Sequence, residues 1–67
     1  MKLSQAKLRA QISSVNRRNQ SWVVWDELRG TYTITDSVHH YKPQHTVCVY
    51  RDGHLHMVFN EKEFNSD

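Results

Sequence analysis

The sequence has few of the features that stabilise very small proteins without a large hydrophobic core. Its 67 residues include one cysteine, which excludes an intrachain disulfide, and no Cys-x-x-Cys pair of the kind that holds structural zinc. There is no run of 18 apolar residues, and the first residues lack the apolar block of a signal peptide. We therefore expect a cytoplasmic protein that neither spans a membrane nor is exported.

Motifs for catalysis and cofactor binding are equally scarce. The two glycines, Gly30 and Gly53, stand in predicted turns, so the sequence has no glycine-rich phosphate loop. Cys48 lies in the middle of a predicted strand among apolar residues, where a thiol behaves as a small hydrophobic group and not as a nucleophile. The sequence thus predicts a protein that is not an enzyme and binds no cofactor.

The five histidines do not predict a metal site. In the hairpin register described below, His54 and His56 lie about 7 Å apart on one face, but no carboxylate or cysteine stands beside them as a third ligand. His45 lies about 13 Å from His56 along the same ladder. The adjacent His39 and His40 are expected to point apart. Positions on the surface and at strand edges account for all five.

The segment 45–59, HTVCVYRDGHLHMVF, predicts a β-hairpin. Asp52-Gly53 is a favoured type I′ turn because glycine tolerates a positive φ, and this turn places Arg51 opposite His54. Counting outward from that pair assigns alternate residues to two faces of the hairpin. The apolar face, which a helix should cover, contains Cys48, Tyr50, Leu55, Met57 and Phe59. The other face has both polar and apolar residues and is expected to be partly exposed to solvent. It contains His45, Val47, Val49, Arg51, His54, His56 and Val58.

A second hairpin is predicted at 21–35, with the strands WVVW and TYTIT around a five-residue loop at 26–30. If Trp25 pairs with Thr31, it lies on the threonine face and is partly exposed. An exposed tryptophan indicates a binding surface, although packing against the core is the commoner role of tryptophan in a strand. The predicted core face of this hairpin contains Trp22, Val24, Tyr32 and Ile34.

Residues 3–19 predict one helix, because neither glycine nor proline interrupts them and Ser4 can serve as the N-cap. At 100° per residue, Leu8, Ile12 and Val15 form one stripe, which we expect to lie on the sheet. A second stripe on the opposite side has small residues that would admit another helix. This second stripe contains Leu3, Ala6, Ala10 and Ser14.

These elements predict an α+β fold in a single domain of residues 1–67. The linker 36–44 could carry a short strand at 38–41 that Pro43 ends, since proline lacks the amide donor. The tail 60–67 is polar apart from Phe64, which could tuck against the domain. The expected architecture is an N-terminal helix on a three- to five-stranded antiparallel meander built from the two hairpins.

Charge is unevenly distributed along the chain. Five cations precede the first acid, Asp26, whereas the remaining four cations are outnumbered by seven acids. A segment this basic favours an acidic partner, either the phosphates of a nucleic acid or an acidic protein surface, although a solvated helix face is equally consistent with it. The cations concerned are Lys2, Lys7, Arg9, Arg17 and Arg18.

Two functional hypotheses remain. The favoured one is a small protein-binding or inhibitory module that self-associates, because a chain of this length buries only about 60 % of its surface and gains stability from a partner. Its candidate contacts are Trp25, Val47, Val49, His54, His56 and Val58. The alternative is a nucleic-acid-associated protein that contacts phosphates through the basic helix, although the sequence has no helix-turn-helix, zinc-finger or aromatic ribonucleoprotein motif.

Overall fold

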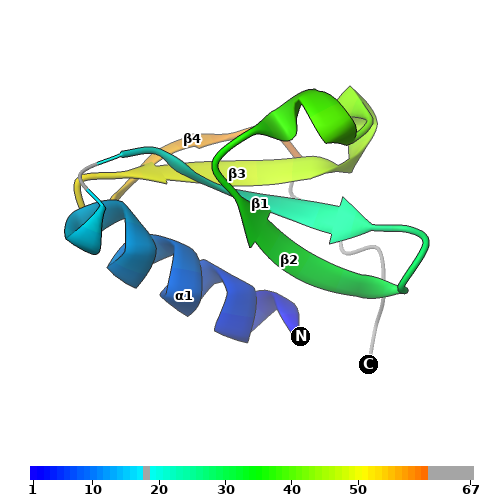
Figure 1. The fold of residues 1–67 in the computed structure, drawn as a ribbon, viewed down its shortest axis with the longest axis horizontal. Helices are drawn as coiled ribbons and strands as arrows, with labels where there is room; N and C mark the ends of the chain where they lie inside the picture. Colours follow the sequence, from blue (N-terminus) through cyan, green and yellow to red (C-terminus); the bar gives the residue numbers. More distant parts are fainter. Residues whose placement is uncertain (18, 61–67) are drawn as a thin grey trace.

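The computed structural model describes residues 1–17 and 19–60, so the predicted polar tail beyond residue 60, with Phe64, lies outside the described residues. The described residues form the elements α1 (Leu3–Asn16), β1 (Ser21–Asp26), β2 (Thr31–Thr35), η1 (Val38–His40), η2 (Pro43–His45), β3 (Thr46–Arg51) and β4 (His54–Val58). Their strands make one antiparallel sheet in the order β2-β1-β3-β4. α1 covers one side of this sheet, and the 3₁₀ turns η1 and η2 lie on the other (Figure 1). The predicted α+β fold is confirmed.

α1 begins at Leu3, as predicted, but it is shorter than predicted and has another N-cap. Its N-cap is Lys2, so Ser4, the predicted N-cap, lies inside the first turn. The side chain of Gln5 supports this start, because its Oε1 accepts a hydrogen bond from the backbone N–H of Lys2 at 3.3 Å. The helix ends at Asn16 instead of residue 19.

α1 packs on the sheet with the face opposite to the predicted one. Its buried residues are small, and they are Ala6, Ala10 and Ser14. The residues left exposed are larger, and we call them the outer stripe: Leu8, Ile12 and Val15. Small side chains let a helix approach its neighbours closely, so α1 lies directly over the central strands β1 and β3. The prediction that the outer stripe covers the sheet is wrong.

Polar contacts with the β3–β4 turn fix this orientation of α1. The backbone N–H of Gly53 donates a hydrogen bond to Ser14 Oγ at 2.9 Å, and Gln11 Nε2 donates one to the Gly53 carbonyl at 3.0 Å. Ser14 Oγ donates in turn to the Gln11 carbonyl at 2.7 Å, so this buried hydroxyl is satisfied. A Cβ at position 53 would stand 2.6 Å from a methyl carbon of Val15. Glycine therefore allows the turn and the helix to meet.

The β1–β2 hairpin is paired one residue away from the predicted register. Trp25 lies opposite Tyr32, because the loop has four residues, 27–30, instead of five. The loop closes with Gly30 at φ 64° and its N–H donating to the Asp26 carbonyl at 2.8 Å. A shift of one residue moves every side chain to the other face of a strand. Trp25 therefore packs on the side of α1, with its ring 4.9 Å from that of Tyr32, and its predicted place on the threonine face is wrong.

The turn of the β3–β4 hairpin is confirmed. Asp52 and Gly53 have φ angles of 53° and 82°, as a type I′ turn requires. Arg51 lies opposite His54, so the turn has the two predicted residues. The chemistry of the Asp-Gly pair thus determined this part of the register.

A β-bulge changes the register further along the same hairpin. Tyr50 pairs with Leu55 as predicted, but β4 then contains one extra residue, His56, so that Val49 lies opposite Met57. Met57 therefore leaves the predicted helix-facing side. The apolar residues of this hairpin that do lie on the side of α1 are Val47, Cys48, Tyr50, Leu55 and Val58, so the prediction that Val47 lies on the other face is wrong. The predicted assignment of Phe59 is also wrong, because its ring stacks on Trp22, on the other side of the sheet, with 5.5 Å between the ring centroids.

The linker covers part of the second face of the sheet (Figure 1). The predicted strand at 38–41 is absent from the described residues, and the two 3₁₀ turns take its place. Pro43 starts η2 instead of ending a strand. The first turn of a helix leaves its backbone N–H groups without partners within the helix, so a proline, which has no N–H, loses no hydrogen bond there. On this side Val24 and Val49 are almost completely buried. The sheet thus has a small core on each face.

Candidate protein-binding surfaces

Exposed apolar side chains gather on two parts of the molecule. The first is the outer stripe of α1, whose three side chains are 57, 51 and 54 % exposed in sequence order. The second is β4 with the residue that follows it, where four apolar residues are 44 to 52 % exposed: Leu55, Met57, Val58 and Phe59. Single exposed aliphatic residues are ordinary on a protein surface, but groups of this kind indicate an interaction surface.

Cations surround the outer stripe. By their helical spacing Lys7 and Arg9 lie on its two sides, and both are exposed. Lys2 and Arg17 are exposed at the two ends of α1, whereas Arg18 lies outside the described residues. The sequence has no acid before residue 26 to balance them. The predicted basic segment is therefore an exposed apolar stripe with a cationic border, which is complementary to an acidic surface with an apolar ridge.

β4 brings together three of the predicted partner contacts. It forms one edge of the sheet, and all five of its residues are exposed, including His54, His56 and Val58. The strand has no lysine, arginine, aspartate or glutamate, which are the residues that commonly protect a sheet edge from pairing with another chain. Another chain could therefore reach both the apolar side chains of β4 and its outer backbone groups.

The other predicted partner contacts lie inside the molecule. Val47 and Val49 are only 3 and 1 % exposed. Val47 is the extra residue of a bulge opposite β1 and packs in the core under α1, while Val49 lies on the side that the linker covers. Trp25 is half-buried against Tyr32. The two valines therefore offer no surface to a partner, because the helix and the linker of the same chain already cover them.

A cleft of about 270 Å³ lies between α1 and β4. It is lined by Leu3, Lys7, Val47, Cys48, Leu55, Val58 and Asn60. Burial raises the pKa of the Cys48 thiol, and the nearby charge of Lys7 opposes this rise only in part. Burial also raises the pKa of the Tyr50 phenol, and Cys48 adds to that rise. Cys48 is therefore protonated at neutral pH, and a buried, protonated thiol is a poor nucleophile.

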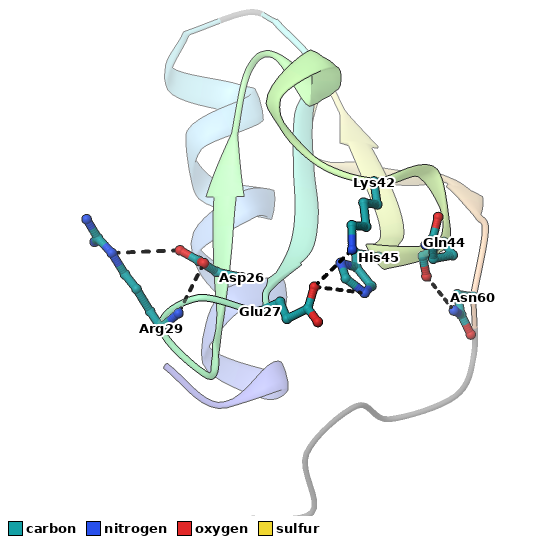
Figure 2. Close-up of polar contacts among 7 residues, drawn as sticks. All are labelled: Asp26, Glu27, Arg29, Lys42, Gln44, His45 and Asn60. Atoms are coloured by element: carbon teal, nitrogen blue, oxygen red, sulfur yellow. Dashed lines mark hydrogen bonds and ion pairs between the residues drawn. The ribbon is translucent and has the colours of Figure 1, made fainter.

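A polar cluster connects the β1–β2 loop to the second 3₁₀ turn, η2 (Figure 2). Glu27 Oε2 lies 3.4 Å from Lys42 Nζ and 4.0 Å from His45 Nε2, and Asp26 Oδ2 lies 3.8 Å from Arg29 Nε. Most of these side chains are exposed, so each pair contributes little to stability. Among residues 1–17 and 19–60, no three histidine, cysteine or acidic side chains are grouped so that they could hold a metal ion. The role of the cluster is therefore to connect the β1–β2 loop with η2.

Sequence reasoning missed the outer stripe as a surface because it assigned the larger side chains of α1 to the core. The available signal was the spacing of Ala6, Ala10 and Ser14, four residues apart on one face. Such small residues permit close approach to any neighbour, to a sheet as well as to another helix. The exposed residues Leu55 and Met57 were missed in the same way, since the prediction placed both under the helix.

Comparison with known proteins gives no assignment. No protein family matches the chain, and no curated protein or solved structure matches it. No helix within the described part of the chain is long and apolar enough to cross a membrane. The functional interpretation therefore rests on the two exposed surfaces.

Proposed function

We propose that this protein is a non-enzymatic protein-binding module that self-associates and that occupies a partner's surface through the outer stripe of α1. The observation that carries the proposal is the exposure of Leu8, Ile12 and Val15 on a helix that buries alanine and serine. Complete burial of one such aliphatic side chain contributes about 1.5–3 kcal/mol, and the fold of the single chain leaves about half of that unused. A partner would complete the burial.

The chemistry of α1 defines the class of partner. Its aliphatic residues follow the i, i+4, i+7 spacing that fits an apolar groove or a second helix. Its cations, with Lys7 and Arg9 on the two sides, favour glutamate or aspartate at the rim of the partner surface. Completing the burial of three half-exposed side chains contributes about 1 kcal/mol each, so the stripe supplies a few kcal/mol and the charges add specificity and association rate. The partner is therefore an acidic protein segment with an apolar ridge.

Fluorescence anisotropy with two labelled peptides tests this proposal. The first is an amphipathic helix with leucine on one face and glutamate on its flanks, and the second has lysine in place of glutamate. We expect the acidic peptide to bind and the basic one to bind at least about tenfold more weakly. Ile12→Lys should weaken acidic-peptide binding by a similar factor, whereas Leu28→Lys, at a loop residue that is 98 % exposed, should leave it unchanged. Equal binding by parent and Ile12→Lys would contradict the proposal.

Nucleic-acid association is the second candidate function, and the exposed cations of α1 without a neighbouring acid favour it. These cations are spread around the helix, which suits diffuse phosphate contact better than insertion into a groove. Neutralising about five phosphates of duplex DNA would make log affinity fall with log salt at a slope of roughly −4 to −5. Substituting both Arg17 and Arg18 by Glu should abolish such binding, whereas loss of binding on an aliphatic-to-polar change such as Ile12→Ser would point back to a protein partner.

A further inference from the structure

The two edges of the sheet differ in what the chain places beside them. At β2, the backbone N–H of Tyr32 and the hydroxyl of Thr31 both donate hydrogen bonds to the carbonyl of Met1, at 3.2 and 3.0 Å. The start of the chain thus occupies part of that edge. At β4, β3 is the only described element that pairs with the strand (Figure 1). An edge strand exposes a row of backbone donors and acceptors, so β4 is the edge that another strand can join.

β4 also presents apolar surface on both of its faces. Leu55 lies on the side of α1, Met57 lies on the side of the linker, and both are about half exposed. α1 packs mainly across the other three strands, so β4 extends beyond the cover of the helix. A strand added at this edge would complete the backbone pairing and cover side chains on both faces together.

We infer that two copies of this chain associate through antiparallel pairing of β4 with β4, which makes one sheet continuous across the dimer. The inference rests on the self-association in the proposed function and names its surface. A two-fold axis requires a patch that is complementary to itself. β4 meets this requirement because it has no lysine, arginine, aspartate or glutamate, so self-pairing opposes no like charges there. Two α1 surfaces, in contrast, would bring cations against cations.

The bulge at His56 makes one register of this pairing available in which different aliphatic residues meet. Antiparallel partners project to the same face of a sheet. Because of the extra residue, Leu55 and Val58 share the side of α1 although they are three positions apart. A two-fold pairing centred between His56 and Met57 keeps the faces matched and places Leu55 opposite the partner's Val58, which is the register that we infer. By symmetry, Val58 lies opposite the partner's Leu55. Each of these two contacts buries aliphatic side chains against each other.

The area available predicts a weak dimer. Four half-exposed apolar residues on β4 and its end supply about 400 Å² per protomer, roughly half of the 800 Å² per partner that a standard interface buries. Backbone hydrogen bonds along the strand add to this area. We expect a dissociation constant of about 10–100 µM, at the transient end of protein interfaces.

Sedimentation equilibrium of the full chain tests the surface. The average mass should rise toward that of a dimer as the concentration increases to about 100 µM, because association follows mass action. Met57→Lys should stay monomeric with an unchanged circular dichroism spectrum, whereas the matched variant Ile12→Lys should still dimerise. A dimer that survives Met57→Lys and is lost in Ile12→Lys would overturn the inference, and so would a parent that is monomeric throughout. Binding of the acidic peptide, which depends on Ile12 and not on Met57, tests the proposed function separately.

Disulfide trapping tests the register without relying on mass. A mixture of Leu55→Cys and Val58→Cys chains should form a disulfide-linked dimer under mild oxidation, since paired residues of antiparallel strands lie within disulfide range. Each variant alone should form much less, because neither position meets its own copy. The parent, whose Cys48 is buried, is the control. Equal trapping in the mixture and in the single variants would overturn the register.

Discussion

The two sides of α1 differ in a way that contradicts the simplest rule for amphipathic helices. The inner side, with Ala6, Ala10 and Ser14, is completely buried, although its side chains contribute little apolar area. The outer stripe has the larger aliphatic residues and leaves about half of their surface in water. The difference teaches that close approach and satisfied hydrogen bonds decide which side of this helix docks on the sheet. Side-chain size then decides what the other side offers to a partner.

The largest expected effect is at the inner side. Ala10→Leu places a large side chain at a completely buried position between the helix and the sheet, and such overpacking should lower the free energy of unfolding by about 2–3 kcal/mol. The matched change on the outer stripe, Leu8→Ala, should alter it by less than about 0.5 kcal/mol, as for most exposed positions. Urea unfolding followed by circular dichroism measures both. A greater loss in Leu8→Ala than in Ala10→Leu would reverse the assignment of the two sides.

A smaller effect is expected where the β3–β4 turn meets the helix. Gly53→Ala combines a positive φ of 82° with a Cβ placed 2.6 Å from Val15, so we expect a loss of about 1–2 kcal/mol. Truncation of the neighbour in the double variant Gly53→Ala, Val15→Ala should recover the steric part and leave the cost of the backbone conformation. Thermal unfolding of the four chains in this cycle measures the coupling. Strict additivity of the two changes would show that a side chain at position 53 does not contact Val15.

The smallest expected effect is at alkaline pH. The folded pKa of Cys48 is raised by burial, so its contribution to stability is complete below the ordinary thiol pKa of about 8.5 and is lost as pH rises through the folded value. The raised pKa of Tyr50 adds a similar loss at higher pH. Stability measured between about pH 8 and 10 should therefore decline in the parent and decline less steeply in Cys48→Ala. Parallel curves for the two chains would mean that the thiol is open to solvent.

The sequence predicted the features that depend on local chemistry. Asp52-Gly53 specified its turn because few dipeptides accept two positive φ angles, and the turn specified the first pairs of the hairpin. The order of elements followed from the spacing of the turns and from a first segment without glycine or proline. The cationic character of α1 followed from the distribution of charge along the chain. These inferences needed no knowledge of the tertiary contacts.

The features that the sequence did not predict depend on contacts between distant segments. A loop of four residues and a loop of five residues before Thr31 are equally consistent with the sequence. The loop length nevertheless decides on which face of the sheet Trp25 lies. The bulge at His56 has no local signature and moved Met57 in the same way. The docking side of α1 depends on Ser14 meeting Gly53, 39 residues away. The two candidate surfaces could therefore be recognised only after these registers were known.

Nuclear Overhauser contacts between α1 and the sheet test the central claim most directly. The inner side of the helix should show contacts from the Ala10 methyl to Val23 and Cys48, which belong to the same buried cluster. The methyl groups of Ile12, on the outer stripe, should show no contact with either residue. Contacts from Ile12 to Val23 or Cys48, with the Ala10 methyl open to solvent, would contradict both the fold of α1 described above and the binding surface proposed on it.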